Sequence, residues 1–440
     1  MVMNLAFTIS LVLGASAQDN INTQPSYTVI FKEKVAQAVQ NHPQASAAIA
    51  ARDSEKFRQR EARAGLYPTL DMDFSGRYRM SESFEDRFDN IVERSRRKSS
   101  AYASLIGRQL LYDSGQTSSR IDSAKHAFSA AHGEYSLTAS AIALLAVEVH
   151  FDVLFQTERN QLHDRIISDH NEMLEKVKLR FESGRGLSRD VALLEARVAL
   201  AEADRSYAKK DYFTMISEYE KVYGFKAENL QIPMLSHVLP KSMNEALEIG
   251  FVNSQSISVA SAQSLSAKSS VNAEKADLLP HLSVELAATK YDVDRFNPDY
   301  DVTGRLVLNY NLYSGGATTA RISRSMRDYD RARHQEDEAR RQLDRDIKVA
   351  FQDMNLQQER VDALEKATSA SKRNSDQLLV QFEATGGSLL SLLEAKKDYY
   401  SALEQHLSAV SEQNILSYRL LDVMGTLLQT LNVRLDTDLR

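Results

Sequence analysis

The sequence predicts an α+β protein in which very long helices alternate with short β-strands, in a pattern that occurs twice along 440 residues. Proline placement, heptad spacing and a repeated phrase support this prediction. The seven prolines stand at positions 25, 43, 68, 233, 240, 280 and 298, so residues 69–232 and 299–440 contain none. Because proline breaks a helix interior at a cost of about 3 kcal/mol, these two spans are predicted to carry the long helices.

Apolar residues recur at heptad spacing in both proline-free spans. The first set is Ile121, Phe128, Tyr135, Ile142 and Val149, and the second is Leu343, Ile347, Ala350, Met354, Val361 and Leu364. This spacing is typical of long coiled-coil-like helices whose remaining faces are charged and solvated. A helix from about residue 116 to 181 would be roughly 100 Å long at 1.5 Å per residue.

Four short segments instead alternate between apolar and polar residues. They are residues 70–78, 101–112, 281–289 and 302–313. Their length, their one apolar face and their terminal tyrosines are typical of transmembrane barrel strands. Antiparallel sheets of water-soluble proteins show a similar alternation. The pattern therefore predicts four strands and leaves open whether lipid or water surrounds them.

The phrase "LYDSGQTSSRI" at residues 111–121 returns as "LYSGGATTARI" at residues 312–322. Leu-x-Pro-x-Leu also occurs twice, around Pro68 and Pro280, where each proline is expected to end a helix and open a strand. Each half is predicted to run helix, strand, loop, strand, very long helix, turn, long helix. The predicted organisation is repeat 1 at residues 18–230, a linker at 231–243 and repeat 2 at 244–440.

The repeated phrase is expected to form the corner where a strand becomes a long helix, with no ligand bound. The expected corner residues are Tyr112, Gly115, Tyr313 and Gly316. Glycine provides the bend. Serine and threonine at 117–119 and 318–319 are expected to cap the helices that follow.

Composition and motifs exclude several functional classes. The formal charge is -6 with a pI near 6.0, and basic residues are not gathered into a patch, so a nucleic acid partner is not expected. The absence of cysteine excludes disulfides, thiolate metal sites and cysteine nucleophiles. No zinc-protease, nucleophile-elbow, P-loop or dinucleotide motif occurs. We therefore expect neither enzymatic activity nor a cofactor.

The N-terminal segment predicts export. An apolar run from Leu5 to Leu13 precedes Ala15-Ser16-Ala17, the small-residue pattern that export peptidases cut, so residues 1–17 are expected to be a signal peptide. No basic residue precedes the run, which is unusual for such a signal. Beyond it no run of 18 apolar residues occurs, so a membrane role would fall to the strands.

Taken in order, these motifs resemble those of the TolC-like outer membrane factors, the exit ducts of bacterial efflux pumps and type I secretion systems. The resemblance rests on the doubled Leu-x-Pro-x-Leu, the doubled L-Y-x-x-G-x-x-x-x-R, and "RFESG" with a following Asp-Val at residues 180–191. It implies a homotrimer with a twelve-stranded barrel in the outer membrane and an α-barrel in the periplasm. It also implies a periplasmic adaptor and an inner-membrane transporter as partners, with drugs, peptides or proteins as cargo.

The resemblance further implies an aperture at the helix-helix turns near residues 181–190 and 382–394. The candidate gating residues are Glu394, Ser391, Asp190, Phe382, Arg185 and Arg189. Glu394 retains an acid where the family has ring carboxylates, and three symmetric copies would favour cations. Ser391 replaces an expected aspartate, Phe382 lacks the common tyrosine hydroxyl, and Gly387 replaces a basic residue. Closed-state links are therefore expected to be weaker, or to use Arg185 or Arg189.

One alternative of another class remains at the level of sequence. Long heptad helices with short alternating segments also suit a soluble or peripheral coiled-coil structural protein, whose strands would form a small water-exposed sheet. Four strands that lie in a membrane cannot stay open-edged, since about eight close the smallest barrel. The membrane interpretation therefore requires an oligomer, and the soluble interpretation does not.

Overall fold

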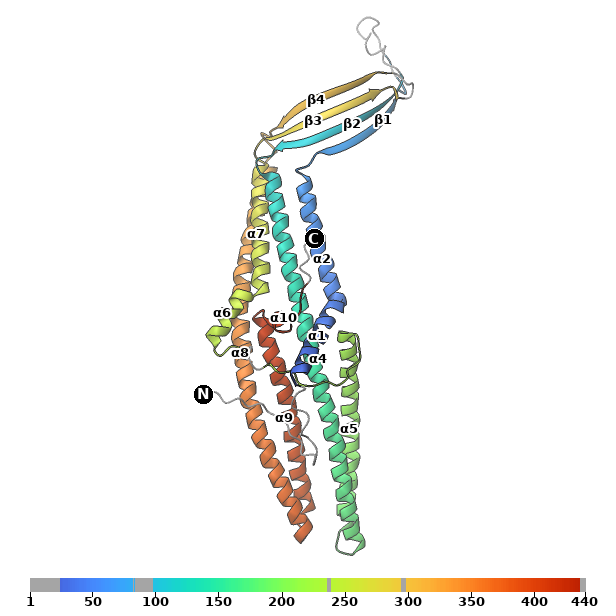
Figure 1. Cartoon of the computed structure of the whole chain (residues 1–440), viewed down its shortest axis with the longest axis vertical. Helices are drawn as coiled ribbons and strands as arrows, with labels where there is room; N and C mark the ends of the chain where they lie inside the picture. The colour runs from blue at the N-terminus through green and yellow to red at the C-terminus, as the bar shows by residue number, and fades with distance from the viewer. Residues whose placement is uncertain (1–23, 82, 84–97, 236–238, 294–297, 436–440) are drawn as a thin grey trace. The chain divides into compact units, whose positions relative to one another are not determined.

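The computed structural model describes residues 24–81, 83, 98–235, 239–293 and 298–435. The predicted signal peptide, residues 1–17, lies outside the described residues. The helices are α1 Gln24–Asn41, α2 Pro43–Ala64, α4 Gln116–Glu182, α5 Ser188–Tyr223, α6 Met243–Asn253, α7 Gln255–Ala276, α8 Ala317–Thr385, α9 Leu389–Val423 and α10 Leu427–Thr430. The strands are β1 Thr69–Tyr78, β2 Ser99–Tyr112, β3 His281–Tyr291 and β4 Tyr300–Asn309 (Figure 1).

The chain divides into two compact units, and each predicted repeat contributes to both. Unit 1 comprises residues 1–42, 139–250 and 346–440, and unit 2 comprises residues 43–138 and 251–345. The very long helices α4 and α8 are continuous and supply a segment to each unit. The elements that the sequence predicted for each half are thus present in order.

Unit 2 carries a four-stranded antiparallel sheet in the order β1-β2-β3-β4 (Figure 1). Polar and apolar residues alternate along the strands, so the polar side chains lie on one face of the sheet and the apolar side chains on the other. The apolar face is strongly exposed: Leu70, Met72, Phe74, Leu286, Val302, Leu306 and Leu308 are each 60 to 76% accessible. A single chain therefore leaves a broad apolar face uncovered, which in monomeric soluble proteins is rare.

The last strand is shorter than the sequence predicted. Alternation extends to Tyr313, but β4 ends at Asn309. The side chain of Asn311 accepts a hydrogen bond from the backbone N–H of Tyr313 at 3.2 Å. Such a local bond competes with ladder pairing and turns the chain early. The corresponding strand β2 does reach Tyr112, as predicted.

Below the sheet, the helical part of unit 2 packs through small residues. The hydroxyl of Ser123 on α4 lies 3.1 Å from that of Ser266 and 2.9 Å from that of Ser270, both on α7. A Cβ at Gly133 would stand 2.5 Å from a methyl of Val259. Small residues thus allow α4 and α7 to approach closely.

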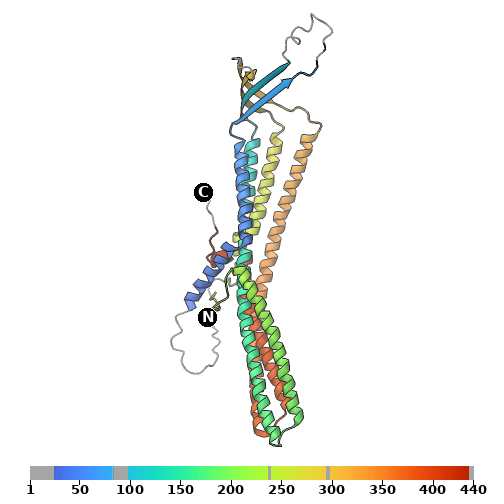
Figure 2. The ribbon, with the colours of Figure 1, turned by 90° about the vertical axis from the view of Figure 1, so that its right-hand side faces the viewer.

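Unit 1 has an aromatic core and two antiparallel helix pairs, α4 with α5 and α8 with α9. Phe31, Phe151 and Tyr418 are nearly inaccessible. Phe31 and Phe151 contact both Tyr418 and the ring of His150, whose Nε2 lies 2.9 Å from the carbonyl oxygen of Gln231. Figure 2 shows α4 and α5 running side by side. This core fixes the helices whose far ends form the candidate site.

Among the described residues, only α4 contains a stretch long and apolar enough to cross a membrane, with a mean hydropathy of 1.7. Half of that stretch is buried within the protein. Ala139, Ile142, Ala143 and Ala146, which lie in α4, are 0 to 2% accessible. Burial of this kind is also typical of a core helix in a soluble protein.

Candidate functional site

The turn between α4 and α5 is set by glycine. Gly184 has a φ of 73°, and the N–H of Arg185 donates to the carbonyl of Arg180 at 2.9 Å, which closes the helix in a Schellman-type turn. A Cβ at Gly186 would lie 2.8 Å from the backbone nitrogen of Phe181. Both glycines are therefore required for the tight return into α5.

The turn between α8 and α9 uses one glycine and a serine cap. Gly386 has a φ of 73° and its N–H donates to the carbonyl of Phe382 at 3.2 Å. Ser388 precedes α9, and its hydroxyl accepts a hydrogen bond from the N–H of Ser391 at 3.3 Å. The backbone of Ser391, a candidate gating residue, is thus held by a serine cap that the sequence analysis did not single out.

An apolar cluster joins the two turns within unit 1. Its buried members are Met173, Leu174, Val177, Leu194, Phe382, Leu389, Leu392 and Leu393. They come from α4, α5, α8 and α9, so the ends of both helix pairs share one core. Neither pair can move at this end without exposing apolar surface.

Arg180 forms a specific link between the two pairs. Its guanidinium carbon lies 4.4 Å from the ring centroid of Phe382, and its Nη2 donates to the carbonyls of Phe382 at 2.9 Å and Glu383 at 3.1 Å. Those carbonyls belong to the last turn of α8, where positive charge is favoured by the helix dipole. One side chain therefore supplies a cation–π contact and a helix cap at once.

A surface ion pair lies beside this link. The ammonium of Lys176 on α4 is 2.9 Å from Glu383 on α8 and 2.9 Å from Glu172 on its own helix. Hydrogen bonds to Glu383 and Glu172 raise the pKa of Lys176, and the bond to Lys176 lowers the pKa of Glu383. Because the pair is exposed, its contribution to stability is small compared with that of Arg180.

Farther along the same helices, α4 is tied to α9 by Asp169. The hydroxyl of Tyr400 donates to Asp169, and the ammonium of Lys396 lies 3.3 Å from the same carboxylate oxygen. Burial, and then the bond to Asp169, raises the pKa of the Tyr400 hydroxyl, so it stays protonated and can donate. The Lys396 side chain is only 12% accessible. Partial burial makes this contact stronger than a surface ion pair.

The predicted aperture residues fall into two groups. Phe382 is buried, as described above, whereas Glu394, Ser391 and Arg185 are exposed. Glu394 makes no hydrogen bond or ion pair with any other part of the chain that the structure describes. Arg189 lies 3.6 Å from its neighbour Asp190. Within the protomer, therefore, the arginine that meets Phe382 is Arg180, and neither Arg185 nor Arg189 does so.

Arg180 and Lys176 were missed by the sequence analysis, although a signal was present. "KVKLRFE" places basic residues in the last turns of a helix, where they suit a C-terminal dipole. The sequence does not show that these side chains serve the end of α8, which lies about 200 positions away. Only the packing of α4 against α8 brings them together.

The repeated phrase forms a bend between strand and helix in both copies, but Tyr112 ends β2 whereas Tyr313 lies beyond the end of β4. Ser114 and Gly115 have φ of 56° and 85°, and Gly315 and Gly316 have 65° and 84°. The prediction that serine and threonine at 117–119 and 318–319 cap the helices is wrong. Asp113 accepts from the N–H groups of Gly115 at 3.1 Å and Thr117 at 2.6 Å. In the second copy the Ser314 hydroxyl accepts from Thr318 N–H at 3.3 Å, because the cap must precede the helix.

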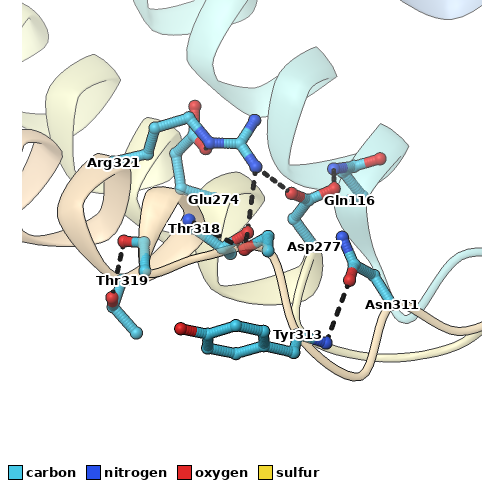
Figure 3. Close-up of polar contacts among 10 residues, drawn as sticks. Gln116, Glu274, Asp277, Asn311, Tyr313, Thr318, Thr319 and Arg321 are labelled. Carbon is cyan, nitrogen blue, oxygen red and sulfur yellow. Dashed lines mark hydrogen bonds and ion pairs between the residues drawn. The ribbon is translucent and has the colours of Figure 1, made fainter.

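Asp277, just after α7, joins the two corners. Its carboxylate accepts from Arg321 Nη2 at 2.5 Å and from Gln116 Nε2 at 3.3 Å (Figure 3). Arg321 Nε also lies 4.0 Å from Glu274. The arginine of the repeated phrase therefore fixes α8 to α7, and Gln116 fixes α4 to the same carboxylate.

Comparison with known proteins identifies the chain. A family model described as "Outer membrane efflux protein" matches residues 35–218 and 248–426, more than four fifths of the sequence. This chain belongs to the outer membrane efflux protein family. Outer membrane efflux protein BepC of Brucella suis is 22% identical over 320 residues, covering 72% of this chain and 70% of BepC.

Solved structures of other proteins share the fold of this chain. VceC of Vibrio cholerae has a TM-score of 0.79 at 14% identity, covering 90% of this chain and 96% of that one. A membrane protein from Pseudomonas aeruginosa has the same TM-score and identity, covering 90% and 93%. Function follows from the family: this protein is an outer membrane channel-tunnel for efflux, and a soluble coiled-coil protein is not favoured.

Proposed function

We propose that three copies of the chain form one twelve-stranded barrel, continued by a periplasmic helical duct that exports drugs, peptides or proteins without chemical change. An inner-membrane transporter would supply the energy, and a periplasmic adaptor would bridge the two. One observation carries the proposal: the open sheet has an exposed apolar face and a charged opposite face. In lipid such a sheet must be completed by further strands.

The polar face would line the aqueous lumen. It carries Arg108, which lies 3.3 Å from Asp71 and 3.1 Å from Glu285, and Glu285 also pairs with Arg305. Ionised side chains are costly on a lipid-facing surface and acceptable beside water. The apolar face, with Leu70 and Phe74, would accordingly meet lipid.

The gating residue proposed for the aperture is Glu394. It is exposed and free of partners among the described residues, whereas its neighbours Leu392, Leu393 and Ala395 are buried. The buried neighbours fix the backbone of the helix at this point, so Glu394 projects from a defined position. Three symmetric copies around a narrow opening would attract cations and bind divalent ions.

Conductance across planar bilayers tests this assignment. Glu394→Gln is expected to lower the ratio of cation to anion permeability by about threefold or more and to weaken block by divalent cations, since a ring of charge dominates selectivity in narrow pores. Glu195→Gln on α5 is the matched control, because it removes another exposed carboxylate. Unchanged selectivity in Glu394→Gln would remove Glu394 from the gate.

A further inference from the structure

The two β-hairpins of the chain are paired in the same register. The sequence repeat shifts β1 by 212 residues onto β3, since Pro68 corresponds to Pro280, and shifts β2 by 201 residues onto β4, since Leu111 corresponds to Leu312. The pair Thr69↔Arg108 then corresponds to His281↔Asn309, which is the pair observed. The hairpins are therefore equivalent residue by residue.

The junction between the hairpins has its own register. β2 pairs with β3 so that Arg108 stands opposite Glu285, with their side chains 3.1 Å apart. Leu105 stands opposite Ala288 on the other face. This junction is the only example within the described chain of how one hairpin joins the next.

Both outer strands of the sheet have unpaired edges. Within the described residues, β1 pairs only with β2, and β4 pairs only with β3. An open edge cannot persist in lipid, because its N–H and C=O groups have no partners there. The natural complement of an antiparallel hairpin edge is the opposite edge of an identical hairpin.

We propose that β4 pairs with β1 of a second copy in the register of the β2–β3 junction, which places Asn309 opposite Asp73 of the second copy. By the repeat shifts given above, Arg108 of β2 corresponds to Asn309 of β4, and Glu285 of β3 corresponds to Asp73 of β1. This inference rests on the proposed assembly. It adds to it the residues that meet at each boundary between copies.

The side chains that would meet between β4 and β1 of the second copy are compatible on both the polar and the apolar face of the sheet. Asp73 is exposed and makes no hydrogen bond or ion pair with the described residues, so its carboxylate is available to the amide of Asn309. On the apolar face, Leu308 would lie beside Phe74 of the second copy, and both are now exposed. An Asn–Asp contact replaces the Arg–Glu ion pair, so the boundary between copies is weaker than the internal junction.

A competing register would pair opposite charges instead. Sliding the strands by four residues would set Arg305 opposite Asp73, and Asp301 opposite Arg77, on the polar face. Arg305, however, already bonds to Glu285 in its own chain, so its charge is partly satisfied. That register would also destroy the equivalence of the hairpin junctions. It is the alternative outcome of the experiment below.

Cysteine cross-linking distinguishes the two registers, because the chain contains no cysteine of its own. Ser75→Cys with Val307→Cys places the thiols opposite each other in the proposed register, and Ser75→Cys with Thr303→Cys does so in the competing one. Within a single chain β1 and β4 are separated by two strands, about 14 Å at strand spacing. A disulfide spans far less, so only different chains can be linked.

The proposal predicts that oxidised Ser75→Cys/Val307→Cys protein runs as covalent dimers and trimers on denaturing gels, with at least about fivefold more product than Ser75→Cys/Thr303→Cys, whose thiols would be about 13 Å apart. Phe74→Cys with Leu308→Cys repeats the test on the apolar face if the first pair disturbs folding. The reverse preference, or no cross-link in either pair, would overturn the register. Native mass spectrometry of the unoxidised variants distinguishes a wrong register from a wrong assembly. A trimer without the expected cross-link would reject only the register, whereas a monomer would reject the assembly.

Discussion

At the scale of single residues, Arg180 illustrates how one side chain can link two helix pairs. It contacts the ring of Phe382 and two carbonyls of α8, all from the end of α4. Position 382 is a phenylalanine, and its ring contacts the guanidinium of Arg180. The link is internal to the protomer and is therefore independent of how copies meet.

We predict that Arg180→Ala loosens this end of the protein and increases the open probability of the channel in bilayers. Loss of the cation–π contact and the cap would cost about 2 kcal/mol. Arg373→Ala is the matched control, because Arg373 is an exposed arginine of α8 outside the candidate aperture. Equal gating in the two variants would argue against a role for Arg180.

A second residue-scale prediction concerns pH. Burial, with repulsion from Glu148 and Glu412, raises the pKa of Asp152 to about 6. A carboxyl whose pKa is raised by folding contributes stability below its unfolded pKa of about 3.8, and this contribution is lost as pH rises through about 6. The ionised form therefore destabilises the protein at neutral pH.

Asp152→Asn should remove the pH dependence that the Asp152 carboxyl gives to the stability of the protein. Because Asp152 is partly solvated, we expect a gain of only about 1 kcal/mol at pH 8 relative to the wild type, and no gain at pH 4. Thermal unfolding of detergent-solubilised protein at the two pH values measures it, with the exposed Glu202→Gln as control. A gain that is the same at both pH values would show that ionisation is not the cause.

At the scale of elements, the sequence predicted α4 closely, residues 116–181 against Gln116–Glu182, because proline, glycine and heptad spacing agree there. It predicted the caps and the end of β4 less well. The helix caps and the end of β4 depend on which of several adjacent polar side chains accepts a hydrogen bond from a backbone N–H. Asp113, Ser314 and Asn311 are the acceptors observed. Local polarity alone does not distinguish these choices.

The cap of α4 offers an element-scale prediction. Asp113→Ala should cost about 1 kcal/mol of helix stability, since an acidic cap is lost. Amide hydrogen exchange in residues 116–120 should then be about fivefold faster, with Ser118→Ala as the matched control because its hydroxyl bonds only to the carbonyl of Gly115. Unchanged exchange in Asp113→Ala would assign the capping to another group.

At the scale of the whole molecule, the repeat makes the chain two copies of one strand-and-helix unit. The copies differ in the length of the loop between the strands and in the helix turns. The strand registers match between halves, whereas the helix turns do not, with "SGRGL" in one and "GGS" in the other. Sequence periodicity could predict the repeated scaffold. It could not predict the partners of Phe382 or Asp169, which are set by packing between distant helices.

One chain carries only part of a membrane channel. Native mass spectrometry of the protein extracted from outer membranes tests it most directly, because it counts chains in the intact particle. We expect a detergent-bound particle with three times the mass of the mature chain. A stable monomer, or protein recovered only from the soluble fraction, would contradict it.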